Sequence, residues 1–249
     1  MADMPAYIWA LVLIGAVGIP SLTAFGLYRS AAAAPGAGRF RPAVIAGGFA
    51  AVWAGWIAVS AMLADHGVYR QWIGVAAAGA LAFVIGALSI PVVTRGLAGL
   101  PGLARLTWPH VVRVVGVVFL LAMALGKLPA VFALLAGLGD ISVGLSAPVI
   151  ARRLARGDRR GAAWFNVLGL ADLVIAVTIA FLGGLGLNRL GLTPSTIDLA
   201  YLPLALIPST AVPLAFGLHV VSLARLRTSP AGAVRSDPSR RYPQAQIQH

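Results

Sequence analysis

Residues 111–150 read VVRVVGVVFLLAMALGKLPAVFALLAGLGDISVGLSAPVI, a stretch that is almost entirely apolar. A helix that crosses a bilayer needs about 20 such residues, so this stretch is too long for one crossing. The segment Gly126-Lys127-Leu128-Pro129 interrupts it, because glycine and proline end helices. The stretch therefore predicts two consecutive membrane helices, at residues 110–126 and 129–151, joined by a tight turn.

The rest of the chain has the same character. Of its 249 residues 59% are hydrophobic and only 10% are charged. An ordinary soluble domain carries about 25% charged residues, so this composition disfavours a soluble enzyme, a disordered protein and a nucleic-acid-binding protein. Five further apolar stretches are long enough to cross a membrane: 6–28, 42–64, 72–94, 163–187 and 199–224. We predict an all-α, polytopic integral membrane protein, a bundle of seven transmembrane helices in one domain over 1–227, with a disordered cytoplasmic tail at 228–249.

The distribution of basic residues predicts the orientation of this bundle. Loops on the cytoplasmic side of a membrane protein are enriched in Lys and Arg. Placed on alternating sides of seven spans, sixteen basic residues fall on the side of the C-terminus, Arg113 among them, and three on the other, Arg70, Lys127 and Arg189. We therefore expect the N-terminus outside and the C-terminus in the cytoplasm. One Lys against 18 Arg, with abundant Ala and Gly, is typical of a GC-rich genome and favours a bacterial cytoplasmic membrane.

Two acidic residues lie near the middle of predicted spans. Asp140 and Asp172 belong to consecutive spans joined by a short loop, which favours their packing together. Each lies on a stripe of small residues, where membrane helices approach closely, so both carboxyls should face protein and not lipid. A charge at the bilayer centre costs at least about 2.5–3.5 kcal/mol, so the acids must be protonated, paired or bound to a cation.

These acids carry the leading functional hypothesis, a proton- or cation-coupled transporter of a small solute. Spans with interior prolines would supply the moving helices, because proline kinks a membrane helix and frees backbone carbonyls. The interior prolines are Pro20, Pro91, Pro148, Pro208 and Pro213. The predicted substrate- or ion-binding residues are Asp140, Asp172, Asn166, Ser142, Ser209 and Thr210.

The histidines give a different hypothesis, a membrane redox protein. Imidazoles from two helices can ligate a b-type haem, and His110 and His219 both fall in the predicted cytoplasmic third of the membrane. Arg113, predicted about one turn into the fourth span, would pair with a haem propionate. Against this hypothesis stands the different depth expected for the two histidines, about 10 Å apart by helix rise.

A third hypothesis is a non-catalytic structural or regulatory subunit whose polar residues hold helices together. Its partners would be the lipid bilayer and a membrane complex or a second copy of the chain, with no nucleic acid. An enzyme is disfavoured, because the chain contains no Cys and no Glu and shows no dense His/Asp cluster. We predict no catalytic residues, no metal site and no firmly bound cofactor.

Overall fold

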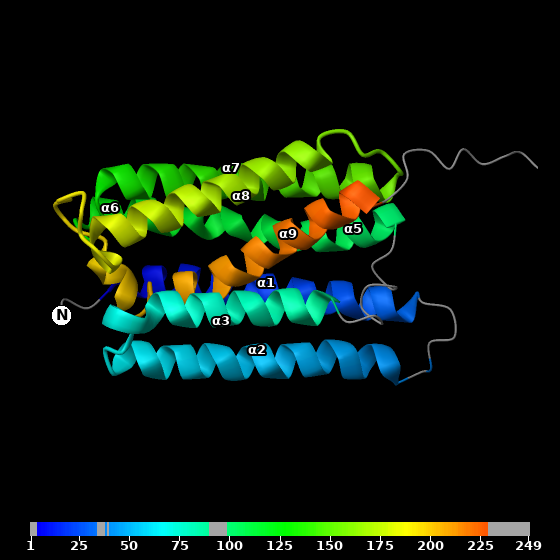
Figure 1. Ribbon diagram of the computed structural model, residues 1–249, viewed down its shortest axis with the longest axis horizontal. Helices are drawn as coiled ribbons and strands as arrows, with labels where there is room; N and C mark the ends of the chain where they lie inside the picture. Colours follow the sequence, from blue (N-terminus) through cyan, green and yellow to red (C-terminus); the bar gives the residue numbers. More distant parts are fainter. Residues whose placement is uncertain (1–3, 34–37, 39, 90–98, 229–249) are drawn as a thin grey trace, which may run out of the picture.

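The computed structural model describes residues 4–33, 38, 40–89 and 99–228. This part of the chain is all-helical and contains seven helices long and apolar enough to cross a membrane: Ala6–Ala32, Arg41–Asp65, Tyr69–Ser89, Gly99–Ala124, Ala130–Ala155, Ala162–Leu185 and Ile207–Arg227. Successive helices run antiparallel along one bundle axis, so α1 begins and α9 ends at opposite ends (Figure 1). The prediction of an all-helical chain with seven helices long and apolar enough to cross a membrane is therefore confirmed.

The first three crossings are continuous α-helices: α1 (Ala6–Ala32), α2 (Arg41–Asp65) and α3 (Tyr69–Ser89). The fourth consists of α5 (Gly99–Thr107), the 3₁₀ helix η1 (Trp108–Gly116) and α6 (Val117–Ala124). A 3₁₀ run of more than four residues is uncommon, and inside a helix it marks a hinge or a site under strain. The turn that the opening stretch predicts is present, because α6 ends at Ala124 and α7 (Ala130–Ala155) begins directly after Pro129.

The last two crossings also change helix type along their length. The α-helix α8 (Ala162–Ala180) continues as the π-helical turn η2 (Phe181–Leu185). A separate short turn η3 (Ile197–Ala200) follows, and then the π-helical turn η4 (Ile207–Ala211) leads into α9 (Val212–Thr228). Single π-helical turns are rare and occur frequently at functional sites.

Two predicted boundaries are wrong. The fourth crossing begins at Gly99 and not near 110, so η1 lies in its middle and not at its end. The predicted start is wrong because Pro101, Arg105 and Pro109 make residues 99–109 look like a loop. The seventh begins at Ile207 and not at 199, which places Pro208 in its first turn and not in its interior. Pro91, residues 90–94 of the third predicted span and the predicted tail at 229–249 lie outside the described residues.

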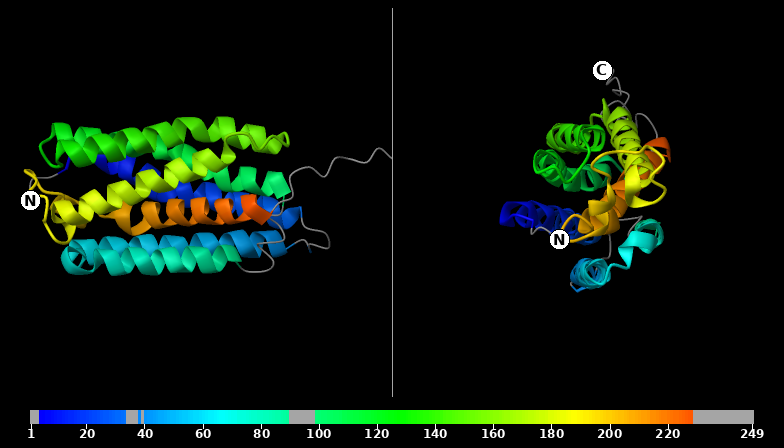
Figure 2. Two further views of the ribbon diagram at one scale, coloured as in Figure 1. Left: turned by 45° about the horizontal axis from the view of Figure 1, so that its top comes forward. Right: turned by 90° about the vertical axis from the view of Figure 1, so that its left-hand side faces the viewer.

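The helices pack as a bundle around α1, α9 and the fourth crossing. The segment η1 packs against α7 and α1, α7 packs against α8, and α8 packs against α9. On the other side α2 packs on α1, and α3 packs on α9 (Figures 1 and 2). Large apolar side chains point outward along the helices, as expected where the solvent is lipid. On α7 they include Leu134, Leu135, Leu138 and Leu145.

The two ends of the bundle differ in charge. One end is formed by the end of α1, the start of α2, the α7–α8 turn and the end of α9, and we call it the arginine-rich end (Figure 1). In the described part of the chain the opposite end carries Arg70, Lys127 and Arg189. The residues that give the arginine-rich end its name are Arg29, Arg41, Arg152, Arg153, Arg156, Arg159, Arg160, Arg225 and Arg227.

Candidate functional site

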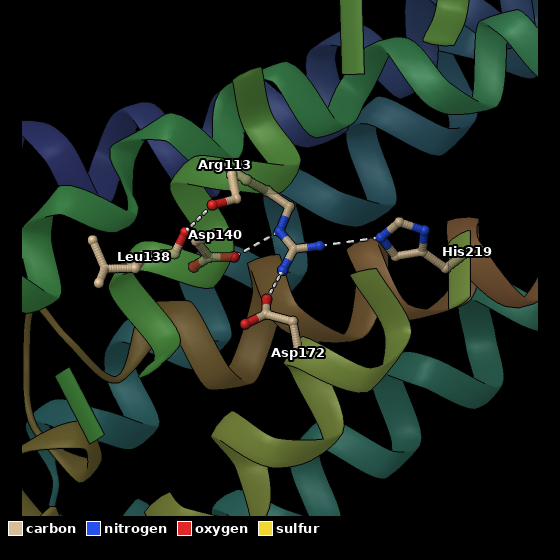
Figure 3. Close-up of polar contacts among 6 residues, drawn as sticks. Arg113, Leu138, Asp140, Asp172 and His219 are labelled. Atoms are coloured by element: carbon tan, nitrogen blue, oxygen red, sulfur yellow. Dashed lines mark hydrogen bonds and ion pairs between the residues drawn. The ribbon is translucent and has the colours of Figure 1, made fainter. Parts of the chain in front are cut away.

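A buried arginine joins its own helix to three others in the middle of the bundle. Arg113 lies on η1, near the centre of the crossing that runs from Gly99 to Ala124, and its side chain is 3% exposed. Its Nε donates to Asp140 Oδ1 on α7 at 2.6 Å, and its Nη2 donates to Asp172 Oδ2 on α8. Its Nη1 lies 3.1 Å from Nε2 of His219 on α9 (Figure 3). We call these four residues the arginine network.

The protonation of His219 follows from its hydrogen bonds. Asn166 Nδ2 donates to the carbonyl of Ala162 at 2.8 Å, so Asn166 Oδ1 is the atom that faces His219. That oxygen can only accept, so His219 Nδ1, at 2.9 Å, carries the hydrogen. Nε2 is then the bare nitrogen and accepts from Arg113. His219 is therefore neutral, with both ring nitrogens used.

The network lies far from both ends of the bundle. Asp140 comes ten residues after α7 begins at Ala130, and Asp172 ten residues after α8 begins at Ala162. At a rise of about 1.5 Å per residue each carboxyl is about 15 Å from the start of its helix, which is half the thickness of a bilayer core. The apolar clusters on either side are separate: Ala136 belongs to one and Val143 to the other.

Glycines make room for the side chains of the network. A Cβ on Gly116 would overlap Asp140, and one on Gly139 would overlap the carboxyl of Asp172. The predicted packing of α7 against α8 is therefore present, and it sets the two carboxyls around one guanidinium, although the glycines of the small-residue stripe predicted on α7 face the fourth crossing and not α8. A Cβ on Gly169 would likewise overlap the ring of His219.

Two small cavities adjoin the carboxyls. The first, of about 30 Å³, is lined by Arg113 and Asp140 together with apolar residues of α1, α6 and α9. The second, of about 40 Å³, is lined by both Asp140 and Asp172 and extends along α7 and α8 past Ala180 to Leu199 near the opposite end. A water molecule needs about 10–15 Å³ of such space, so each cavity has room for two or three.

Three aromatic rings, one of them His219 itself, pack together on the side of Arg113 toward the arginine-rich end. His110 stacks on His219 with ring centroids 3.9 Å apart, and Phe165 contacts His110 at 5.7 Å and His219 at 5.4 Å. We call these three residues the ring cluster. His110 is 1% exposed, and within the described part of the chain neither of its ring nitrogens has a hydrogen-bond partner. Burying these two nitrogens without a partner costs free energy, and such atoms are rare in native proteins.

The histidines do not fit a bis-imidazole haem. Both nitrogens of His219 are already bonded, and the two rings stack face to face where a porphyrin would have to separate them. Arg113 is bonded to two carboxylates and lies near the centre of its crossing, so it does not offer a propionate contact. Among the described residues, no group of three or more His, Cys, Asp or Glu side chains could hold a metal ion.

The predicted hydroxyl partners of the aspartates lie elsewhere. Ser142 is exposed and donates to the carbonyl of Leu138, so its hydroxyl is used within its own helix. Ser209 and Thr210 are buried but donate to carbonyls one turn back in their own chain segment. Asn166 does belong to the site, although it binds His219 and not an aspartate.

Arg113 is the residue whose place sequence reasoning misses. The sequence prediction places it about one turn into its span and counts it with the basic residues of the cytoplasmic side, whereas its guanidinium is the centre of the buried network. The available signal is the run Val-Val-Arg-Val-Val at 111–115, with no other charged residue between Arg105 and Lys127. A lone cation in an apolar run, together with two mid-span acids, indicates an ion pair in the membrane.

The chain belongs to the family described as Domain of unknown function (DUF8737), whose model matches residues 70–227. The matched part extends from the start of α3 into α9 and contains all four residues of the arginine network and the whole ring cluster. No curated protein and no solved structure matches the chain.

Proposed function

We propose that this protein is a proton-coupled transporter of a small solute, with Arg113, Asp140 and Asp172 as its proton-binding site. The observation that carries the proposal is the charge of the arginine network. With His219 neutral, one guanidinium faces two carboxyls, so the fully ionised network has a net charge of −1. An uncompensated charge at this depth is costly, and binding one proton removes it.

The surroundings of the carboxyls support reversible binding of a small cation. Their side chains remain 17% and 14% exposed, whereas Arg113 is almost fully enclosed. The adjoining cavities are otherwise apolar. They have room for a few water molecules, which suits a proton or hydronium ion better than a larger solute at this point. The solute itself would then bind in another conformation of the bundle.

Irregular helices around the network support movement of the site. Arg113 lies on a 3₁₀ segment, and η4, which lines the second cavity with Ile207 and Pro208, is a π-helical turn. Transporters commonly build midplane sites from interrupted helices, because the broken segments can rearrange while others stay rigid. Protonation would release a carboxyl from Arg113 and so free these segments to move.

We further propose that the arginine-rich end faces the cytoplasm of a bacterial cell, with the chain in the cytoplasmic membrane. With Arg113 placed inside the bundle, fifteen basic residues of the sequence remain on the side of the C-terminus against three on the other. This excess follows the positive-inside rule. The cavity beside Asp140 and Asp172 would then extend toward the outside.

Proton uptake into vesicles tests the function. Purified protein is reconstituted into sealed liposomes that contain a pH-sensitive dye, and a pH gradient is imposed alone or with members of a panel of sugars, amino acids and alkali cations. We expect at least one condition to move protons faster than in empty vesicles. Asp140→Asn and Asp172→Asn should reduce that rate to the background, and the exposed Asp65→Asn should leave it unchanged.

Two results would overturn the proposal. One is a native rate no higher than in empty vesicles under every condition of the panel. The other is a native rate that both Asn variants retain. Either result, obtained with correctly inserted protein, would leave the arginine network as a structural ion pair and favour a structural or regulatory subunit.

A further inference from the structure

The ring cluster and the next turn of α9 contain buried polar atoms without a hydrogen-bond partner among the described residues. Four buried side-chain atoms in the described part of the chain have no hydrogen-bond partner. Three of them are the two ring nitrogens of His110 and the hydroxyl of Ser222. Ser222 is 2% exposed and follows His219 by three residues on α9, toward the arginine-rich end.

These atoms lie on one side of the network. His110 precedes Arg113 by three residues on a crossing that starts at the arginine-rich end, so it is about 6 Å closer to that end by 3₁₀ rise. Ser222 is about 4.5 Å closer than His219 by α-helical rise. Polar groups are rarely left orphaned in a single static core, but groups that meet water in another conformation have partners there.

We propose that His110, Phe165 and His219 form a gate that closes Arg113, Asp140 and Asp172 from the arginine-rich end, and that His110 and Ser222 line the hydrated path when it opens. This rests on the proposed function, since a transporter must expose its site to both sides in turn. The cavity along α7 and α8 leads from the carboxyls toward the opposite end. On this side the three rings pack against one another next to Arg113.

The gate and the proton site share one moving element. His110 and Arg113 are three residues apart on η1, and in a 3₁₀ helix such residues point in the same direction. Conversion of this segment to α-helix would turn them about 60° apart around the axis. A change of helix type in η1 would therefore turn Arg113 and His110 relative to each other, and would couple the proton site to the ring stack.

Thiol labelling tests the gate without measuring transport. The chain has no Cys, so Ser222→Cys in the full-length protein introduces a single thiol. In lipid nanodiscs, where both ends of the bundle face water, a charged maleimide should label this thiol slowly. Ala155→Cys, at the exposed end of α7, supplies the reference for a fully accessible thiol.

Opening the gate should expose the Ser222→Cys thiol. Adding Phe165→Ala removes a ring that is 6% exposed and contacts both histidines. We expect the labelling rate to rise about tenfold or more, because the cavity left behind loosens the local packing. Phe119→Ala is the matched control, because Phe119 is 4% exposed and lines the cavities on the other side of the network. It should leave the rate unchanged. Phe165→Leu serves if the alanine variant does not fold.

Three results would overturn the gate: fast labelling of Ser222→Cys in the otherwise native chain, no change on truncating Phe165, or an equal rise with Phe119→Ala. The proposed proton site is tested separately, and proton flux retained in the two aspartate variants would overturn it. Loss of the gate therefore leaves the proposed function standing, and loss of the proposed function leaves the labelling result intact as evidence for a buried water path.

Discussion

The guanidinium of Arg113 and the imidazole of His219 are joined by a hydrogen bond of 3.1 Å, across two helices whose residues are 106 positions apart in the sequence. Asn166 fixes the tautomer that makes this bond possible, so a neutral side chain on α8 controls how η1 contacts α9. Arg113 thereby connects its own helix to three others: to α7 and α8 through carboxylates, and to α9 through a neutral ring.

Removing the cation alone should destabilise the protein far more than removing all three charged groups of the network. We expect Arg113→Leu to lower the free energy of unfolding by about 3–5 kcal/mol, because it leaves two carboxyls buried without their partner. Thermal unfolding in detergent measures the effect.

Arg113→Leu combined with Asp140→Asn and Asp172→Asn should recover most of that stability, since no buried charge is left unpaired. This triple variant should be folded and should move no protons. A triple variant as unstable as Arg113→Leu alone would show that the arginine contributes through packing and not through charge.

Loss of the Asn166 amide should destabilise the protein, because His219 loses a hydrogen-bond partner. Asn166→Ala leaves the Nδ1 hydrogen of His219 without an acceptor in a buried position, which we expect to cost about 1–3 kcal/mol. Ser142→Ala is the control, because its exposed hydroxyl donates to the carbonyl of Leu138 on the outer face of α7. Equal melting temperatures for the two variants would mean that the tautomer of His219 is not held by Asn166.

Methyl groups added next to the network should lower the stability of the protein. Gly139→Ala and Gly116→Ala place a Cβ against Asp172 and Asp140, and overpacking of this kind costs about 1–3 kcal/mol. On α2 a Cβ at Gly55 meets no atom of the described residues within 4 Å, so Gly55→Ala should be neutral or slightly stabilising. Thermal melting curves of the three variants test this prediction. Equal curves for all three would contradict the close packing of α7 at the network.

The sequence predicts the architecture better than it predicts the site. Apolar length and the Gly126–Pro129 interruption are enough to give seven helices, and the midspan positions of Asp140 and Asp172 follow from them. The position of Arg113 does not, because two prolines and Arg105 hide the first turns of its crossing. Depth along a helix also does not tell which face a residue lies on, because that depends on how the helix is rotated. The sequence prediction therefore groups Ser142 with the aspartates, although Ser142 faces outward.

The stacked histidines lead to a spectroscopic expectation. Because both nitrogens of His219 are bonded and its ring lies flat against His110, the purified protein should show no Soret band from a haem held by these residues, oxidised or reduced with dithionite. Expression with haem supplied makes the test fair. A Soret band that disappears in both His110→Ala and His219→Ala would require a different arrangement of the two rings.

We propose that the arginine network takes up and releases a proton, and infrared difference spectroscopy tests this directly. The carbonyl stretch of a protonated carboxyl is recorded as the bulk pH is lowered. We expect a band in the native protein and in Asp65→Asn that is missing from the Asp140→Asn, Asp172→Asn double variant. Identical difference spectra for the native protein and the double variant would contradict the claim, because no carboxyl of the network would then be changing its protonation.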